Sequence, residues 1–291
     1  MDNFFKERLI SLVPVPMMCQ SAVAGVNLWR REAQNAQSFY VAHPMVSFVV
    51  SGAKRTVAGG IETVYREGEF LVVGATMPGH CRVLSIEREE PFLSLSVDLD
   101  MGLLRKCFFE LGKTFEGTEA VEAVFSGEID GEMQEALRHL ISVLSRPEHA
   151  GFIGPLIVEE LHFLLAASEV GPKLRQLLEA NTVSSRILGV VEQIQKDCAV
   201  VLDPEVMARS VGMSVSVFYR NFKRTTGMSP LQFQKRTRLF RAQELMLMNQ
   251  ERVSTAAHAV GYDDLSQFSR EYKREFGLSP LKHVAQCGAQ S

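Results

Sequence analysis

Cationic side chains recur at a fixed spacing in the carboxy-terminal third of the chain. Two stretches fifty residues apart each carry an arginine followed three residues later by a Lys-Arg pair. The six cations are Arg220, Lys223, Arg224, Arg270, Lys273 and Arg274. Lysine and arginine bind phosphate oxygens, and an arginine can also donate two hydrogen bonds to O6 and N7 of a guanine. The spacing therefore predicts contact with a polyanion, and with double-stranded DNA in particular.

The charge of the chain is divided unevenly. The 291 residues carry a net charge of −3, with 31 Lys and Arg against 34 Asp and Glu. Residues 1–184 hold 16 Lys and Arg against 24 Asp and Glu (net −8), whereas residues 185–291 hold 15 against 10 (net +5). A basic region joined to an acidic one predicts two domains with separate tasks, which we place at 1–183 and 184–291.

The cationic stretches belong to an internal repeat. SVFYRNFKRTTGMSPL at residues 216–231 recurs as SQFSREYKREFGLSPL at residues 266–281, with nine of sixteen positions identical. Unrelated sequences share about one position in sixteen, so coincidence is a poor explanation. The similarity extends upstream, where MARSVGM at 207–213 corresponds to AAHAVGY at 256–262. The chain therefore contains two copies of one structural unit.

Each copy is predicted to form a helix, a tight turn and a second helix, at about residues 203–227 and 252–277. In the first copy Asp203 is suited to cap the opening helix, and Gly212 permits the left-handed backbone of a sharp turn. Gly261 occupies the equivalent position in the second copy. The residues expected to face inward are Val206, Met207 and Val211 in the first opening helix, and Val253, Ala256, Ala257 and Val260 in the other.

The second helix of each copy has a cap, a buried edge and a stop. Ser214 is suited to cap the first of these helices, and Asp263 or Asp264 the other. Glycine ends each helix, at positions 227 and 277. The residues expected to form the buried edges, at i and i+4, are Phe218 with Phe222 and Phe268 with Tyr272. From Ser229-Pro230 a long helical pattern joins the two units.

The exposed faces of the second helices supply the predicted DNA contacts. Two such helices about 34 Å apart fit successive major grooves on one face of a duplex. The residues predicted to contact phosphates are Lys223, Arg224, Lys273 and Arg274. Arg220 and Arg270 are predicted to contact guanine, and Gln267 adenine. Ser216, Tyr219 and Ser266 are predicted to contact bases or sugars.

These motifs resemble the AraC/XylS family of bacterial regulators. The resemblance covers roughly residues 187–285 and is carried by SVGMSVSVFYRNFKRTTGMSP and VGYDDLSQFSREYKREFGLSPLKH. It implies two helix-turn-helix units in which exposed residues early in each second helix contact bases. These positions are Ser216, Tyr219, Arg220, Ser266, Gln267 and Arg270. Leu265 departs from a position that is often polar in the family, which leaves the base preference of the second unit open.

The amino-terminal portion has a different composition. Short β-rich runs at 46–50, 70–73, 82–86 and 92–97 alternate with Gly and Pro signals, and helical patterns follow at 103–111, 133–144 and 156–165. The segments that resemble the companion domain of one AraC subgroup are His43-Pro44, 51–60, 68–74 and 89–100. That resemblance implies a small cupin-like β-barrel followed by helices, with sensing and dimerisation as its role. The predicted fold class is therefore α+β, with an all-α carboxy-terminal domain.

No catalytic or metal-binding motif is recognised in the amino-terminal portion. Cupin-type catalysis uses a His-x-His pair with further ligands, and His43 and His80 stand alone. The five cysteines lack a metal-site spacing and are expected to be reduced and mostly buried; Cys81 and Cys107 were considered as sensors and not favoured. Lys54 and Arg55 are suited to bind an anionic ligand, although a solvated loop is the favoured interpretation. We therefore expect no cofactor, no metal and no enzymatic activity.

The favoured hypothesis is a sequence-specific DNA-binding transcription regulator, such as an activator, controlled by a small-molecule effector in the amino-terminal domain. Two alternatives stay open: a cupin-like enzyme or alkyl-transfer protein fused to a DNA-binding module, and an architectural DNA-bending protein. Contact with RNA polymerase and a homodimer are compatible with the first hypothesis. The amino terminus MDNFFKERLI does not resemble a signal peptide, and no long uncharged apolar window occurs, so we expect a cytoplasmic protein without a membrane partner.

Overall fold

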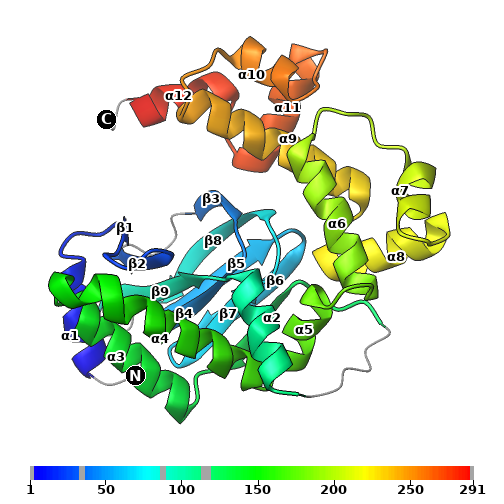
Figure 1. Ribbon diagram of the computed structural model, residues 1–291. Coiled ribbons are helices and arrows are strands. Elements are labelled where there is room, and N and C mark those ends of the chain that lie inside the picture. Colours follow the sequence, from blue (N-terminus) through cyan, green and yellow to red (C-terminus); the bar gives the residue numbers. More distant parts are fainter. Residues whose placement is uncertain (1–2, 33–36, 86–89, 113–118, 289–291) are drawn as a thin grey trace.

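The computed structural model describes residues 3–32, 37–85, 90–112 and 119–288. Figure 1 shows a sheet domain with helices on one side and, above it, an arc of helices that ends at the carboxy terminus. The long helices of this arc belong to the last third of the chain. The fold is therefore α+β, with a β-sheet domain followed by an all-α domain, as the sequence predicts.

Two antiparallel sheets form the amino-terminal domain. One has six strands in the order β1-β2-β9-β4-β7-β10, and the other has four in the order β3-β8-β5-β6. The strands are β1 Met18–Gln20, β2 Val26–Arg31, β3 Gln37–Ala42, β4 Met45–Ser51, β5 Ala53–Ala58, β6 Ile61–Arg66, β7 Glu69–Val73, β8 Met77–Ser85, β9 Phe92–Asp98 and β10 Val124–Glu128. Strand β6 packs against β7 and β4 of the other sheet, so the two sheets enclose a common interior.

The four β-rich runs of the sequence correspond to β4, β7, β8 and β9. The last residue of the third run, Ile86, lies outside the described residues. Strands β1, β2, β3, β5, β6 and β10 were not among the predicted runs, and the expectation that Lys54 and Arg55 occupy a solvated loop was wrong. Both residues lie on β5, where side chains alternate between the two faces: Lys54 is buried and Arg55 is exposed. The two consecutive cations made this segment resemble a polar loop, although one face of β5 lies inside the domain.

Six helices surround the sheets and lead to the carboxy-terminal domain. They are α1 Asn3–Leu12, α2 Met101–Glu110, α3 Gly131–Leu144, α4 Pro147–Ala167, α5 Gly171–Leu178 and α6 Val183–Lys196. The three helical patterns of the sequence fall in α2, α3 and α4. Helix α4 is, by length and composition, apolar enough to cross a membrane, and it packs against α2, α3 and α5.

The carboxy-terminal helices form the two predicted units. They are α7 Pro204–Ser210, α8 Val215–Thr226, α9 Pro230–Leu247, α10 Val253–Ala259, α11 Leu265–Phe276 and α12 Pro280–Gly288. The side chains of Asp203, Ser214 and Asp264 cap α7, α8 and α11. Gly227 and Gly277 end α8 and α11 in the left-handed conformation, as expected. One inward assignment was wrong, because Val206 is 53% exposed.

The buried core crosses the predicted domain boundary. One apolar cluster extends from the sheets through α6 and α7 to Phe218 and Phe222 of the first helix-turn-helix unit and to Phe233 of α9. A separate cluster fills the second unit, and Phe39 of β3 packs against it. The ring of Phe39 lies 5.0 Å from that of Phe276 and 6.3 Å from that of Phe240. Both units therefore contact the sheet domain, the first through a continuous core and the second through one strand.

Candidate nucleic-acid interface

Helix α8 presents a cationic face opposite a fully buried edge. Phe218 and Phe222 are each 0% exposed, and their rings pack against each other and against Phe233. On the outer side, the exposed residues predicted to bind DNA are Ser216, Arg220, Lys223 and Arg224. Tyr219 is half-buried beside Phe218. Four of the five predicted residues on this helix are therefore accessible, and the fifth is partly so.

Helix α11 repeats the arrangement. Phe268 and Tyr272 are each 0% exposed. The exposed residues predicted to bind DNA are Ser266, Gln267, Arg270, Lys273 and Arg274. The Gln267 side-chain amide donates a hydrogen bond to Glu271 at 3.3 Å, so its contact with a base would need this bond to open. The cations of the repeat thus lie on equivalent outer faces of the two second helices.

Helix α9 fixes the two units relative to each other. Its 18 residues span about 27 Å, which is close to the rise of one turn of B-DNA, about 34 Å. Arg238, near its middle, donates to the backbone oxygens of Cys198 (2.7 Å) and Ala199 (3.0 Å), before the first unit, and of Gly261 (3.3 Å), in the turn of the second. A single guanidinium therefore ties the segment before the first unit and the turn of the second unit to α9.

Ion pairs attach α11 to α9. Lys235 pairs with Glu271, and Arg236 pairs with Glu275 at 2.6 Å. The Tyr262 hydroxyl also donates to Glu271 at 2.7 Å. Burial would raise the pKa of Glu271, but the bonds from Lys235, Tyr262 and Gln267 lower it below its usual value. No local pattern predicts the two ion pairs, because Lys235 lies 36 residues from Glu271 and Arg236 lies 39 residues from Glu275 along the chain.

The sheet domain contacts the end of α8 through the backbone. The Gly60 N–H donates to the Thr226 carbonyl at 2.8 Å, and the Ala123 N–H donates to the Thr225 carbonyl at 2.9 Å. A Cβ atom on Gly60 would lie 2.4 Å from the Gly227 oxygen, so only glycine fits this approach. The hairpin between β5 and β6 is therefore held against the first helix-turn-helix unit.

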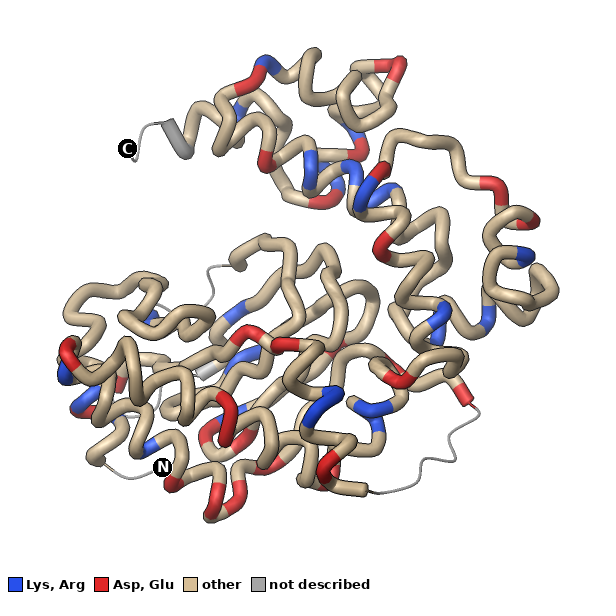
Figure 2. The backbone as a smooth tube through the Cα atoms, viewed as in Figure 1, with Lys and Arg blue, Asp and Glu red and all other residues tan. Residues whose placement is uncertain are grey.

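Acidic residues of the sheet domain lie beside the cations of α8. Glu119 pairs with Arg224 at 3.2 Å, with both side chains largely exposed. Glu62 and Glu122 line an open hollow of about 510 Å³ together with Arg220 and Lys223. Figure 2 shows acidic positions of the sheet domain next to the basic positions of α8. A DNA phosphate approaching this end of α8 would meet negative charge as well as positive.

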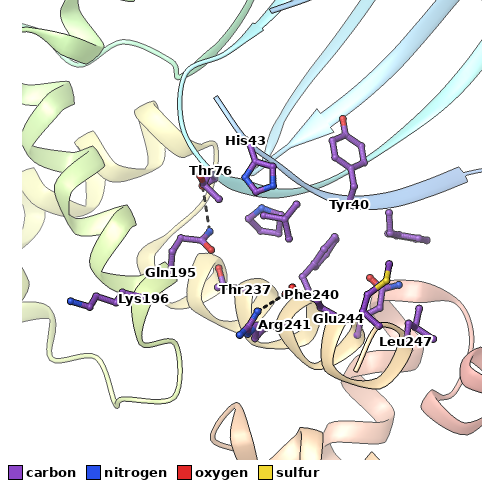
Figure 3. A pocket seen from close by; sticks show the side chains of 15 residues that line it. Tyr40, His43, Thr76, Gln195, Lys196, Thr237, Phe240, Arg241, Glu244 and Leu247 are labelled. Carbon is purple, nitrogen blue, oxygen red and sulfur yellow. Dashed lines mark hydrogen bonds and ion pairs between the residues drawn. The ribbon is translucent and has the colours of Figure 1, made fainter. Parts of the chain in front are cut away.

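A larger cavity of about 660 Å³ lies between the two domains (Figure 3). Its walls come from β3, the end of α6 and the carboxy-terminal half of α9. Its lining combines apolar and aromatic side chains with polar ones: Phe39, Tyr40, His43, Phe240, Leu247 and Met248, and Gln195, Lys196, Arg241 and Glu244. Gln195 donates to the Thr76 carbonyl at 3.3 Å, across the domain boundary. The cavity has the size and the mixed lining of a small-molecule site.

Within the described ranges, no group of three or more His, Cys, Asp or Glu side chains is placed to hold a metal ion. Cys81, Cys107 and Cys198 are buried free thiols. Burial raises the pKa of the Cys107 thiol, which disfavours the reactive thiolate at neutral pH.

Two capped helix-turn-helix units with matching cationic helices, joined to a sheet domain, define a DNA-binding transcription regulator. Residues 22–173 match the family model described as the AraC-type transcriptional regulator N-terminus, and residues 207–286 match a helix-turn-helix domain model. The chain belongs to the AraC family of transcriptional regulators.

Known relatives cover different shares of the chain. The thermoregulatory protein LcrF of Yersinia pestis is 25% identical over 238 residues, which are 81% of this chain and 83% of LcrF. The transcriptional activator RhaS of Escherichia fergusonii is 26% identical over 153 residues, 52% of this chain, and the match spans only about half (54%) of RhaS. Crystal structures of ToxT from Vibrio cholerae have the same fold. One, with an unsaturated fatty acid bound, has a TM-score of 0.54 at 10% identity and covers 89% of this chain and 94% of ToxT.

Proposed function

We propose that this protein is a sequence-specific DNA-binding transcription regulator in which a small-molecule effector sets how the helix-turn-helix units engage a promoter. The observation that carries the proposal is the repeated face: six cations on two equivalent helices, all exposed, held by one rigid connector. A single basic helix is often only a solvated surface. Two copies with the same buried edge and the same outward cations favour a shared task on one ligand.

The DNA contacts divide into two kinds. Lys223, Arg224, Lys273 and Arg274 lie in the last turns of their helices and are assigned to phosphates. Arg220 and Arg270 lie one turn earlier, and each is assigned to a guanine. Gln267 is assigned to adenine, whereas Ser216, Tyr219 and Ser266 are assigned to bases or sugars.

The contact between the sheet domain and α8 provides the coupling. While Glu119 pairs with Arg224, and Glu62 and Glu122 lie across from Arg220 and Lys223, the first unit binds phosphates weakly. An effector in the cavity between β3 and α9 would change how the domains pack and would release or reinforce this contact. ToxT, which shares the fold, has an unsaturated fatty acid bound in one of its structures, and this supports an effector for the present chain.

Further parts of the proposal concern assembly and location. RhaS is an activator, which supports activation and a contact with RNA polymerase here. The exposed apolar residues Phe152, Leu156 and Phe163 share one side of α4, and we assign this side to a homodimer. We also propose that the protein is cytoplasmic and is not an enzyme.

Selection from random duplexes tests the proposal. The wild-type protein should enrich a site with two conserved segments. Arg220→Ala and Arg270→Ala should each relax preference in a different segment, by about 1–3 kcal/mol at one base pair. Lys223→Ala is the matched control: it should weaken binding to every sequence equally. Enrichment of no site, or unchanged preference in both arginine variants, would refute the assignment.

A further inference from the structure

A lysine is buried between the two sheets. Lys54 lies on β5, where the side chains of Lys54, Thr56 and Ala58 point to the interior, and it is only 4% exposed. Lysine is rarely this buried without an anionic partner, because taking an ammonium group out of water costs several kcal/mol unless it is compensated. A lysine buried at this position therefore needs an anionic partner.

Lys54 has no acidic partner among the described residues. Its Nζ atom lies 4.7 Å from the ring centroid of Trp29 and 6.0 Å from that of Phe92, and its side chain also hydrogen-bonds with Cys81. Arg31, whose guanidinium carbon lies 5.8 Å from the Trp29 ring, likewise forms no ion pair within the described ranges. Within the described part of the chain, two cations thus share one aromatic wall and neither forms an ion pair with a carboxylate.

The nearby polar groups do not neutralise the ammonium. Burial raises the pKa of the Tyr40 phenol, which is therefore uncharged at neutral pH, and its hydroxyl is buried without a hydrogen-bond partner. Burial acts to lower the pKa of Lys54, but the neighbouring Tyr65, Cys81 and Tyr40 oppose this effect and leave the pKa raised. An anionic group beside the Lys54 ammonium would favour its charged form and compensate for its burial.

A small hollow adjoins the ammonium group. It measures about 20 Å³ and is lined by Trp29, Arg31, Ser38, Lys54, Cys81, Val83 and Phe92. A space of this size holds about one water molecule, so a carboxylate would enter it only with a shift of the surrounding side chains. Among the described residues, the lining combines two cations, a hydroxyl and a thiol with the apolar surfaces of Trp29, Val83 and Phe92, and includes no acidic side chain.

We propose that this hollow is the anchor of a second ligand site, at which the carboxylate of a small organic acid pairs with Lys54 and its apolar part lies against Trp29 and Phe92. A ligand larger than its carboxylate would displace the Trp29 side chain, which is only partly buried. The site differs from the interdomain cavity, because none of the residues that line one lines the other. Tyr40 lies between them: it lines the interdomain cavity, while in Figure 3 its hydroxyl points away from α9.

The only tryptophan of the chain reports on the site. The full-length protein is titrated with sodium benzoate and sodium butyrate while Trp29 emission and the melting temperature are followed. Sodium chloride at equal ionic strength corrects for screening, and benzamide and butyramide test for charge. We expect the carboxylates to shift the emission and raise the melting temperature, and the matching amides to do neither.

Variants of one strand separate the site from the rest of the domain. Lys54→Met should weaken carboxylate binding by roughly thirtyfold or more, because it removes one partner of a buried charge pair. Lys54→Arg should retain the response. Arg55→Met is the matched control, because Arg55 is the next residue on β5 and its side chain points outward. This variant should bind carboxylates as the wild type does.

Three results would overturn the proposal: no response of the wild type to either carboxylate, equal responses to carboxylates and amides, or equal binding by the wild type and Lys54→Met. The amide comparison uses the wild type alone, so it stands even if a Lys54 variant fails to fold. The measurement involves no DNA. A protein that binds carboxylates but selects no DNA site would refute the proposed function and leave this site intact.

Discussion

The salt dependence of DNA binding follows from the assigned phosphate contacts. Four contacts give a slope of log K against log[salt] of about −3.6, at about −0.9 per phosphate. Raising salt from about 50 to about 200 mM would then lower affinity by about 150-fold. Arg224, however, is paired with Glu119 at 3.2 Å. If the sheet domain keeps this contact on DNA, three contacts remain, with a slope of about −2.7 and a loss of about 40-fold.

Two substitutions separate these cases. Lys273→Ala should reduce the magnitude of the slope by about 0.9, because this residue has no acidic partner in the described part of the chain. Glu119→Gln should steepen the slope by a similar amount if the wild type binds DNA with Arg224 still paired, and should leave it unchanged if the pair opens on binding. Lys106→Ala, which removes an exposed cation from α2, is the charge-matched control.

Fluorescence anisotropy of a labelled duplex carrying the selected site, repeated over a series of salt concentrations, measures these slopes. An unchanged slope in Lys273→Ala would refute the phosphate assignment. So would an equal change in Lys106→Ala, because the effect would then follow net charge and not position.

Two further perturbations address the domain contact and the sheet domain. Gly60→Ala places a Cβ 2.4 Å from the Gly227 oxygen, so it should loosen the contact between the sheet domain and α8 and raise DNA affinity. Gly131→Ala, which has open space around its Cβ, is the control and should leave DNA affinity unchanged. An unchanged affinity in Gly60→Ala would contradict the coupling. Burial lowers the pKa of His162 in the folded protein, whereas the unfolded chain keeps the ordinary value of about 6.5. The free energy of unfolding should therefore fall as the pH drops below about 6.5 and through the folded pKa. His162→Gln should remove part of that fall in urea titrations at several pH values and the exposed His139→Gln none of it; equal pH dependence in both would argue against the buried ring as its source.

The helix-turn-helix units could be predicted because their signals are local. Caps, turn glycines and aromatic pairs at i and i+4 act within one or two turns of chain, and the repeat presents each signal twice. The exception, Val206, also has a local cause. Met207, Ala208 and Val211 share one face of α7, and Val206 lies 200° around the helix from Ala208, so it points outward.

The domain contact and the hydrogen bonds of Arg238 could not be predicted, because they join residues that lie far apart in the sequence. The approach of Gly60 to Gly227 joins positions 167 residues apart, and no local pattern announces it. The same holds for Arg238, which joins the two units from a helix that the sequence marks only as a connector. Strand β5 was not predicted for another reason. Lys54 is a buried cation, and it interrupts the alternation of apolar inward and polar outward residues by which strands are recognised. Such interruptions are expected at functional positions.

The central claim is that α8 and α11 occupy successive major grooves on one face of a duplex. Hydroxyl-radical footprinting on the selected site tests it most directly. With α8 and α11 in successive grooves, we expect two protected segments about 10 base pairs apart, of which Arg270→Ala combined with Lys273→Ala removes only one. A single protected segment, or loss of both segments together in that variant with its fold intact, would contradict it.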